Sequence, residues 1–150
     1  MSVTVNGKKI TDEEIYQEMQ HHPADSVEAA ADKAAKALVI KELLLQEAIN
    51  LNVQVDGVDS GDGNYDAALI DALFTEVIKT PELDDNSIGR FYQNNIARFK
   101  QADGAIMPLD TAKEFIEEYM MENFWQNSIR EYIRKLALDA KISGVTLVAL

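Results

Sequence analysis

The sequence predicts a mostly α-helical domain in which a small two-stranded sheet joins the two ends of the chain. The 150 residues are 47% hydrophobic and 27% charged, which is typical of a globular protein that buries a core. Most of the chain carries apolar residues at helical spacing. Short β-like segments occur only near its two ends. We therefore expect residues 1–150 to form a single helical domain.

Each end of the chain contributes one β-like segment. Val3–Val5 lies in an alternating stretch that stops at Asn6-Gly7, a dipeptide typical of tight turns. Val145–Val148 follows Gly144, which is placed like a glycine at a helix C-cap. A single strand leaves its backbone groups unpaired, and this is costly in a buried position. We therefore expect Val3–Val5 to pair with Val145–Val148.

Five helices are expected between these segments. They cover residues 11–20, 25–51, 64–79, 85–96 and 111–141, and residues 100–110 form a loop. Three of them open with a capping-box pattern, at Thr11–Glu14, Asp25–Glu28 and Thr111–Glu114. The helix at 25–51 has one broad apolar half that includes Leu44 and Ile49, with Val39 and Leu43 on the other half. We expect it to be covered from more than one side.

The charge of the chain excludes several classes of partner. Lys and Arg number 14 against 26 Asp and Glu, a net charge of −12, which is the wrong sign for binding nucleic acid or an anionic membrane surface. No apolar run is long enough to insert into a bilayer. The absence of Cys excludes disulfides and thiolate metal sites. We expect a cytoplasmic protein if Met1 is the native start, and a periplasmic one if a signal peptide was removed.

Several motifs resemble the N-terminal chaperone region of SurA-type and parvulin-type peptidyl-prolyl isomerases. The first part of the resemblance lies in Val5-Asn6-Gly7, Ile10-Thr11, Leu43–Ala48 and Leu51-Asn52-Val53. Pro81, Phe91-Tyr92 and Phe99 are similar to the segment that precedes the catalytic domain in that family. Ile116, Trp125, Tyr132-Ile133, Leu136, Ala140, Ile142 and Gly144-Val145 are similar to the segment that follows it. The chain is especially similar to the nitrogenase-maturation isomerases of the NifM kind.

The chain departs from that family in one respect that bears on activity. A parvulin domain lies between the two segments in the family, whereas here Lys100–Asp110 alone fills the interval. Parvulin catalysis relies on paired buried His residues, and this chain has only His21 and His22, at the end of the first helix. The resemblance therefore implies a chaperone scaffold without its catalytic domain. We expect no isomerase activity, no catalytic residue and no cofactor.

Aromatic and Met residues gather late in the chain and suggest a binding surface. Adjacent helical residues differ by about 100° in direction, so the members of this group cannot all face inward. We expect Tyr119 and Trp125 in the core and some of the others on the surface. Exposed Met and aromatic side chains are typical of surfaces that bind many peptides. The candidate peptide-binding residues are Phe91, Tyr92, Met120, Met121 and Phe124.

Three other features admit a functional interpretation beside a structural one. His21-His22 could bind a metal ion, the Asp-rich segment 56–66 could bind calcium, and Lys41 could bind a substrate carboxylate. The Asp spacing does not fit the EF-hand pattern. A Lys on an apolar helix face more often pairs with a carboxylate of a neighbouring helix. We favour the structural interpretation for all three and predict no metal site.

These observations favour a non-catalytic folding factor that binds unfolded or assembling polypeptides in an apolar groove between helices. One alternative is a structural module that forms a homodimer through the surface around Met120 and Phe124. A further alternative is a member of the isomerase family with residual activity.

Overall fold

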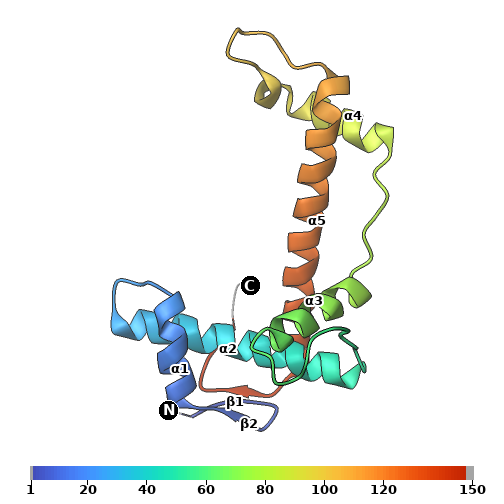
Figure 1. The fold of residues 1–150 in the computed structure, drawn as a ribbon. Coiled ribbons are helices and arrows are strands. Elements are labelled where there is room, and N and C mark those ends of the chain that lie inside the picture. Colours follow the sequence, from blue (N-terminus) through green and yellow to red (C-terminus); the bar gives the residue numbers. More distant parts are fainter. Residues whose placement is uncertain (1, 148–150) are drawn as a thin grey trace. The chain divides into compact units, whose positions relative to one another are not determined.

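The computed structural model describes residues 2–147 and confirms the predicted fold class (Figure 1). The described chain is mostly helical, with a small antiparallel sheet that joins strands from near both ends. In chain order the elements are β1 (Val3–Val5), β2 (Lys8–Ile10), α1 (Asp12–Glu18), η1 (Met19–His21), α2 (Val27–Asn50), α3 (Tyr65–Val77), α4 (Asp85–Asn94), η2 (Ile96–Phe99), α5 (Leu109–Asp139) and β3 (Ile142–Ser143), where η is a 3-10 helix.

The chain divides into two compact units. Unit 1 comprises residues 1–77 and 129–150, and unit 2 comprises residues 78–128. The helix α5 therefore contributes its first part to unit 2 and its last part to unit 1. Two such units can belong to one domain, so the single domain at 1–150 stays a prediction. No helix within residues 2–147 is long and apolar enough to cross a membrane.

The sheet in unit 1 has the strand order β2-β1-β3. A hairpin joins β1 to β2 through Asn6 and Gly7, whose φ angles of 51° and 87° match the tight turn that joins antiparallel strands. On its other edge β1 pairs with β3, with Val5 opposite Ile142 and Thr4 opposite Ser143. The hydroxyl oxygens of Thr4 and Ser143 are 2.5 Å apart. The predicted pairing of the two ends is therefore present.

The strand that closes the sheet differs from the predicted one. The partner of β1 is Ile142–Ser143 and not Val145–Val148. Gly144 has a φ of +88°, so the chain leaves the extended conformation directly after Ser143. Val145 and Leu147 instead pack, partly buried, against the core of unit 1, and Val148 lies outside the described residues. The short strand Lys8–Ile10, which we did not expect, follows from the Asn6-Gly7 turn.

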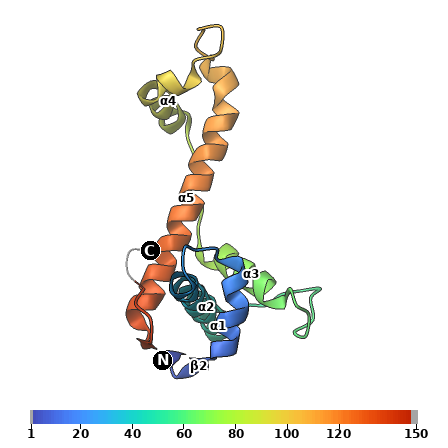
Figure 2. The same ribbon diagram turned by 90° about the vertical axis from the view of Figure 1, so that its left-hand side faces the viewer.

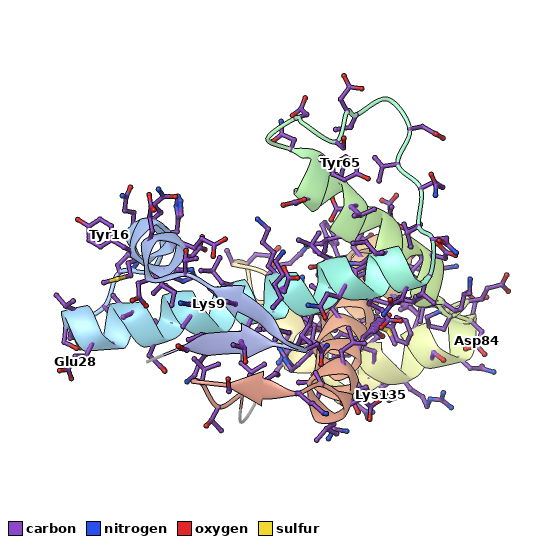
Figure 3. The ribbon with its side chains drawn as sticks, turned by 90° about the horizontal axis from the view of Figure 1, so that it is seen from below. Lys9, Tyr16, Glu28, Tyr65, Asp84 and Lys135 are labelled. Atoms are coloured by element: carbon purple, nitrogen blue, oxygen red, sulfur yellow. The ribbon has the colours of Figure 1, made fainter. Side chains whose placement is uncertain are left out.

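The core of unit 1 forms around α2. Val3 and Val5 of β1 are buried in it, and the buried cluster contains Val3, Val5, Ile10, Ala35, Val39 and Leu43. α1, α3 and the β1–β2 hairpin all contact α2 (Figures 2 and 3), so the prediction that it is covered from several sides is confirmed. The predicted apolar half is wrong in part, because Val39 is fully buried whereas Ile49 is 69% exposed. The sheet packs on the half of the helix that carries Val39 and Leu43.

Asn6 ties the hairpin turn to two other segments. Its backbone N–H donates to the Lys141 carbonyl at 2.8 Å, and its side-chain oxygen accepts from the Lys141 N–H at 2.9 Å. Its side-chain amide donates to Gln46 on α2 at 2.8 Å. Gln46 in turn donates to the Val5 carbonyl at 3.2 Å. These bonds connect β1, α2 and the chain after α5 at one point.

Of the three predicted capping boxes, only the one at the start of α1 is present as expected. At α1 the predicted capping box of Thr11 and Glu14 is present in both directions. At α2 the cap is Ser26, which accepts from the Ala29 N–H, and not Asp25 as predicted. α5 begins at Leu109, before the predicted Thr111, because the Thr111 and Ala112 amides bond to the Pro108 carbonyl. The predicted capping box at Thr111 is therefore wrong.

The first prediction concerns Gly144. A Cβ atom at this position would lie 2.4 Å from the Ser2 carbonyl oxygen, and the φ of +88° disfavours any L side chain. Gly144→Ala should therefore lower the stability of unit 1 by more than about 2 kcal/mol, measured by urea denaturation followed by circular dichroism. Gly57→Ala is the matched control, because Gly57 has a φ of +80° but open space around it. Equal losses in the two variants would contradict the close packing of Ser2 on Gly144.

Candidate peptide-binding site

The short amphipathic helix α4 contributes half of the buried core of unit 2. Its N-cap is Asp84, whose carboxylate accepts from the Ser87 N–H at 2.8 Å. The same bond holds the pKa of Asp84 below its usual value. Ile88, Phe91 and Tyr92 follow at spacings of three and four residues and so lie on one face of the helix. Ile88 and Tyr92 are buried, and Phe91 is partly buried.

The first turns of α5 form the other half of the core of unit 2. Ala112 and Ile116 are fully buried against Ile88 and Tyr92. Met120, one turn further on, packs partly buried on the same cluster. Figures 1 and 2 show α4 beside this part of α5. Ala112, Ile116 and Met120 are four residues apart and share one side of α5, so this face of α5 is the buried one.

Tyr92 fixes the loop that leads into α5. Its hydroxyl donates to the Met107 carbonyl at 2.6 Å, and its ring lies 5.2 Å from that of Phe99 between centroids. Between these two contacts the loop folds back on itself. Lys100 and Ile106 form an isolated antiparallel β-bridge, and the Met107 N–H donates to the Phe99 carbonyl. Phe99 is thereby held against the core.

An apolar hollow of about 240 Å³ opens on the surface of unit 2. We call it the aromatic hollow, and its lining consists of Phe91, Arg98, Phe99, Phe115, Ile116 and Tyr119. The rings of Phe91 and Tyr119 lie 5.3 Å apart at a tilt of 48°. Phe115 is 60% exposed and Tyr119 is 44% exposed, so the wall of the hollow on α5 is open to solvent.

One cation borders the hollow. The guanidinium of Arg98 lies 5.9 Å from the centre of the Tyr119 ring, and its Nη1 donates a long hydrogen bond of 3.5 Å to the Tyr119 hydroxyl. The hydrogen bond with the Asn123 side chain, and then the contact with Arg98, hold the pKa of Tyr119 below its usual value. Arg98 is therefore anchored on the ring and defines one edge of the hollow.

The five predicted binding residues lie at different depths in unit 2. Phe91 lines the hollow. Tyr92 is buried beneath it, and Met120 is partly buried against the same core. Met121 and Phe124 are partly buried and are not among the described residues that line the hollow.

The prediction that Tyr119 lies in the core is wrong, because the side of α5 next to it carries Ile116 into the core instead. Trp125, the other residue expected in the core, is partly buried. Five residues line the hollow without having been predicted as binding residues, namely Arg98, Phe99, Phe115, Ile116 and Tyr119. The signal that could have found the site is the spacing of Ala112, Ile116 and Met120, four residues apart on one face.

The other sequence candidates lie in unit 1. Lys41 pairs with Asp66 of α3 at 3.5 Å, as the structural interpretation predicted. The Nε2 of His22 lies 3.0 Å from a Glu18 carboxylate oxygen, one helical turn away. Within residues 2–147 no group of three or more His, Cys, Asp or Glu is placed to hold a metal ion.

Comparison with known proteins identifies no relative. No protein-family model, no curated protein and no solved structure matches the chain. The resemblance to SurA-type and parvulin-type proteins therefore stays a prediction that depends on the motifs quoted above. The residues that line the aromatic hollow are therefore the basis for proposing a function.

The second prediction tests the support beneath the hollow. Tyr92→Phe removes the hydroxyl that bonds Met107 and leaves a carbonyl oxygen with one donor fewer, which should destabilise unit 2 by about 1 kcal/mol. Hydrogen exchange of the α4 amides should then become roughly fivefold faster, as measured by mass spectrometry. Tyr16→Phe is the control, because Tyr16 is 70% exposed on α1. Unchanged α4 exchange in Tyr92→Phe would contradict the role of this bond.

Proposed function

We propose that the protein is a non-catalytic folding factor that binds apolar segments of unfolded or assembling polypeptides in the aromatic hollow. The observation that carries this proposal is the exposure of Phe115 and Tyr119 beside Phe91 and Phe99. Exposed apolar surface grouped around a concavity is characteristic of sites that bind other chains. Aromatic side chains provide large contact areas for such binding.

The size of the hollow favours weak and reversible binding. Its volume of about 240 Å³ is suited to one large apolar side chain rather than to a folded partner. Full burial of one such side chain contributes about 2–3 kcal/mol before the cost of ordering the bound segment. A single hollow therefore holds a polypeptide loosely, which suits a factor that must release its client for folding.

The groups that line the hollow support binding rather than chemistry. Among the described lining residues, four carry aromatic rings, one is an isoleucine and one is an arginine. Rings and a guanidinium bind through burial and cation–π contact. General acid–base catalysis requires a group that can exchange a proton near neutral pH, such as His or a carboxyl group with a raised pKa. The proposal therefore includes no reaction and no cofactor.

The third prediction concerns the aggregation of a client protein. The purified chain, in severalfold excess, should suppress the aggregation of a chemically unfolded test protein diluted into buffer, measured by light scattering. The double variant Phe115→Ser, Tyr119→Ser should lose most of this effect, because it removes the exposed wall of the hollow. Phe115 is 60% and Tyr119 is 44% exposed, and neither belongs to the buried cluster of unit 2, so the variant should keep its fold, which circular dichroism would verify.

Tyr16→Ser is the matched control, since it removes an aromatic side chain that is 70% exposed on α1 in unit 1. This variant should suppress aggregation as well as the unchanged protein does. Failure of the unchanged protein to suppress aggregation would refute the proposal, as would full activity of the double variant. A tight dimer that the double variant dissociates would instead support the alternative of a self-associating module.

A further inference from the structure

We propose that the aromatic hollow selects segments in which an apolar side chain is accompanied by a nearby Lys or Arg. This inference rests on the proposed function, because it specifies the class of polypeptide that the same site binds. Its basis is the arrangement of charge around the hollow, in which carboxylates follow Phe115 along α5 and Arg98 of η2 lines the hollow beside Tyr119.

A row of carboxylates follows the exposed wall of the hollow on α5. Glu118 comes three residues after Phe115, so it lies about 60° around the helix from that side chain. Ile116, which is buried, lies about 100° from Phe115 in the opposite direction. Glu122, seven residues after Phe115, lies nearly in line with it. Glu114 continues the row on the same side as Glu118.

These carboxylates are available to a ligand. Glu114, Glu118 and Glu122 are all exposed. Within residues 2–147, no ion pair of 4 Å or less involves Glu114 or Glu118. The nearby Lys113 pairs with Asp85 of α4 at 2.9 Å. Glu122 also accepts a hydrogen bond from Gln126 at 2.9 Å. The row therefore presents exposed negative charge beside an apolar surface.

Arg98 sets the direction in which a bound segment can lie. Its guanidinium is held over the Tyr119 ring, on the wall of the hollow formed with η2. A cationic side chain of the ligand is repelled there and attracted by the glutamates on the far side of Phe115. The apolar side chain then enters the hollow while the Lys or Arg extends across α5. The net charge of −12 on the whole chain adds a long-range attraction for such segments.

The expected selectivity is modest and depends on salt. Exposed pairs of opposite charge contribute little individually, so each well-placed Lys should tighten binding about threefold. Two of them should give about tenfold. Because these charges are exposed, roughly 0.5 M salt should remove most of the gain while leaving the apolar contribution in place.

The fourth prediction compares four fluorescent peptides of equal length by anisotropy at low salt. The first carries Phe with two Lys three and four residues away, the second Phe with Ser, the third Phe with Glu, and the fourth replaces Phe by Ser but keeps both Lys. We expect the first to bind about tenfold more tightly than the second. The third should bind more weakly than the second, and the fourth should not bind measurably.

Variants distinguish the glutamate row from the general charge of the protein. Glu114→Gln with Glu118→Gln should remove most of the advantage of the first peptide over the second, because only Glu122 of the row remains, and should leave binding of the second unchanged. Glu28→Gln with Glu76→Gln is the matched control, because it removes two exposed carboxylates from unit 1 and so changes the net charge equally. This control should retain the advantage. Equal losses in the two double variants would overturn the inference.

The same measurements separate failure of this inference from failure of the proposed function. If the first and second peptides bind equally, the charge selectivity is wrong and the proposed function stands. If no peptide containing Phe binds, both are wrong. If the unchanged protein is a dimer that Phe115→Ser dissociates, the occupant of the hollow is a second copy of the chain, and the inference is also overturned.

Discussion

The structure of unit 2 depends on which face of α5 packs against α4. Neighbouring residues of a helix differ by about 100° in direction, so Phe115 and Ile116 cannot both be buried at one contact. Ala112 and Ile116 occupy the contact and are buried in one cluster with Ile88 and Tyr92 of α4. Phe115 and Tyr119 are consequently left on the surface despite their size. The hollow thus follows from the packing of the core.

Unit 1 depends on a different constraint, the need to pair the backbone groups of short strands. A hairpin of two short strands is marginally stable at best in water. In this protein β1 is paired on both edges, with β2 on one side and β3 on the other. Asn6 adopts a positive φ in the turn while its side chain bonds the chain after α5. Gly144 allows that chain to pass close to Ser2. Residues near both ends of the sequence therefore form one core.

The sequence alone predicts features that depend on local chemistry. The helices, the Thr11 cap, the Asn6-Gly7 turn and the pairing of the two ends follow from spacing and residue type. It does not predict which half of α2 the sheet covers or where Tyr119 lies, since those depend on contacts between distant segments. The exact strand opposite β1 was missed because Gly144 was interpreted as the glycine at a helix C-cap, whereas it ends the strand Ile142–Ser143. The predicted binding residues lie on α4 and α5, which also carry lining residues of the aromatic hollow, but only Phe91 of them lines it.

Site-specific photo-crosslinking during client binding tests directly whether unfolded polypeptides bind in the aromatic hollow. Phe115 is replaced by the photoreactive p-benzoylphenylalanine, which keeps an aromatic side chain at the hollow, and Tyr16 is replaced in the same way as a control on unit 1. On irradiation with an unfolded, basic client, we expect covalent adducts at position 115 that an excess of a peptide containing Phe and Lys suppresses. Adducts that are absent at position 115, or equally frequent at position 16, would contradict binding in the hollow.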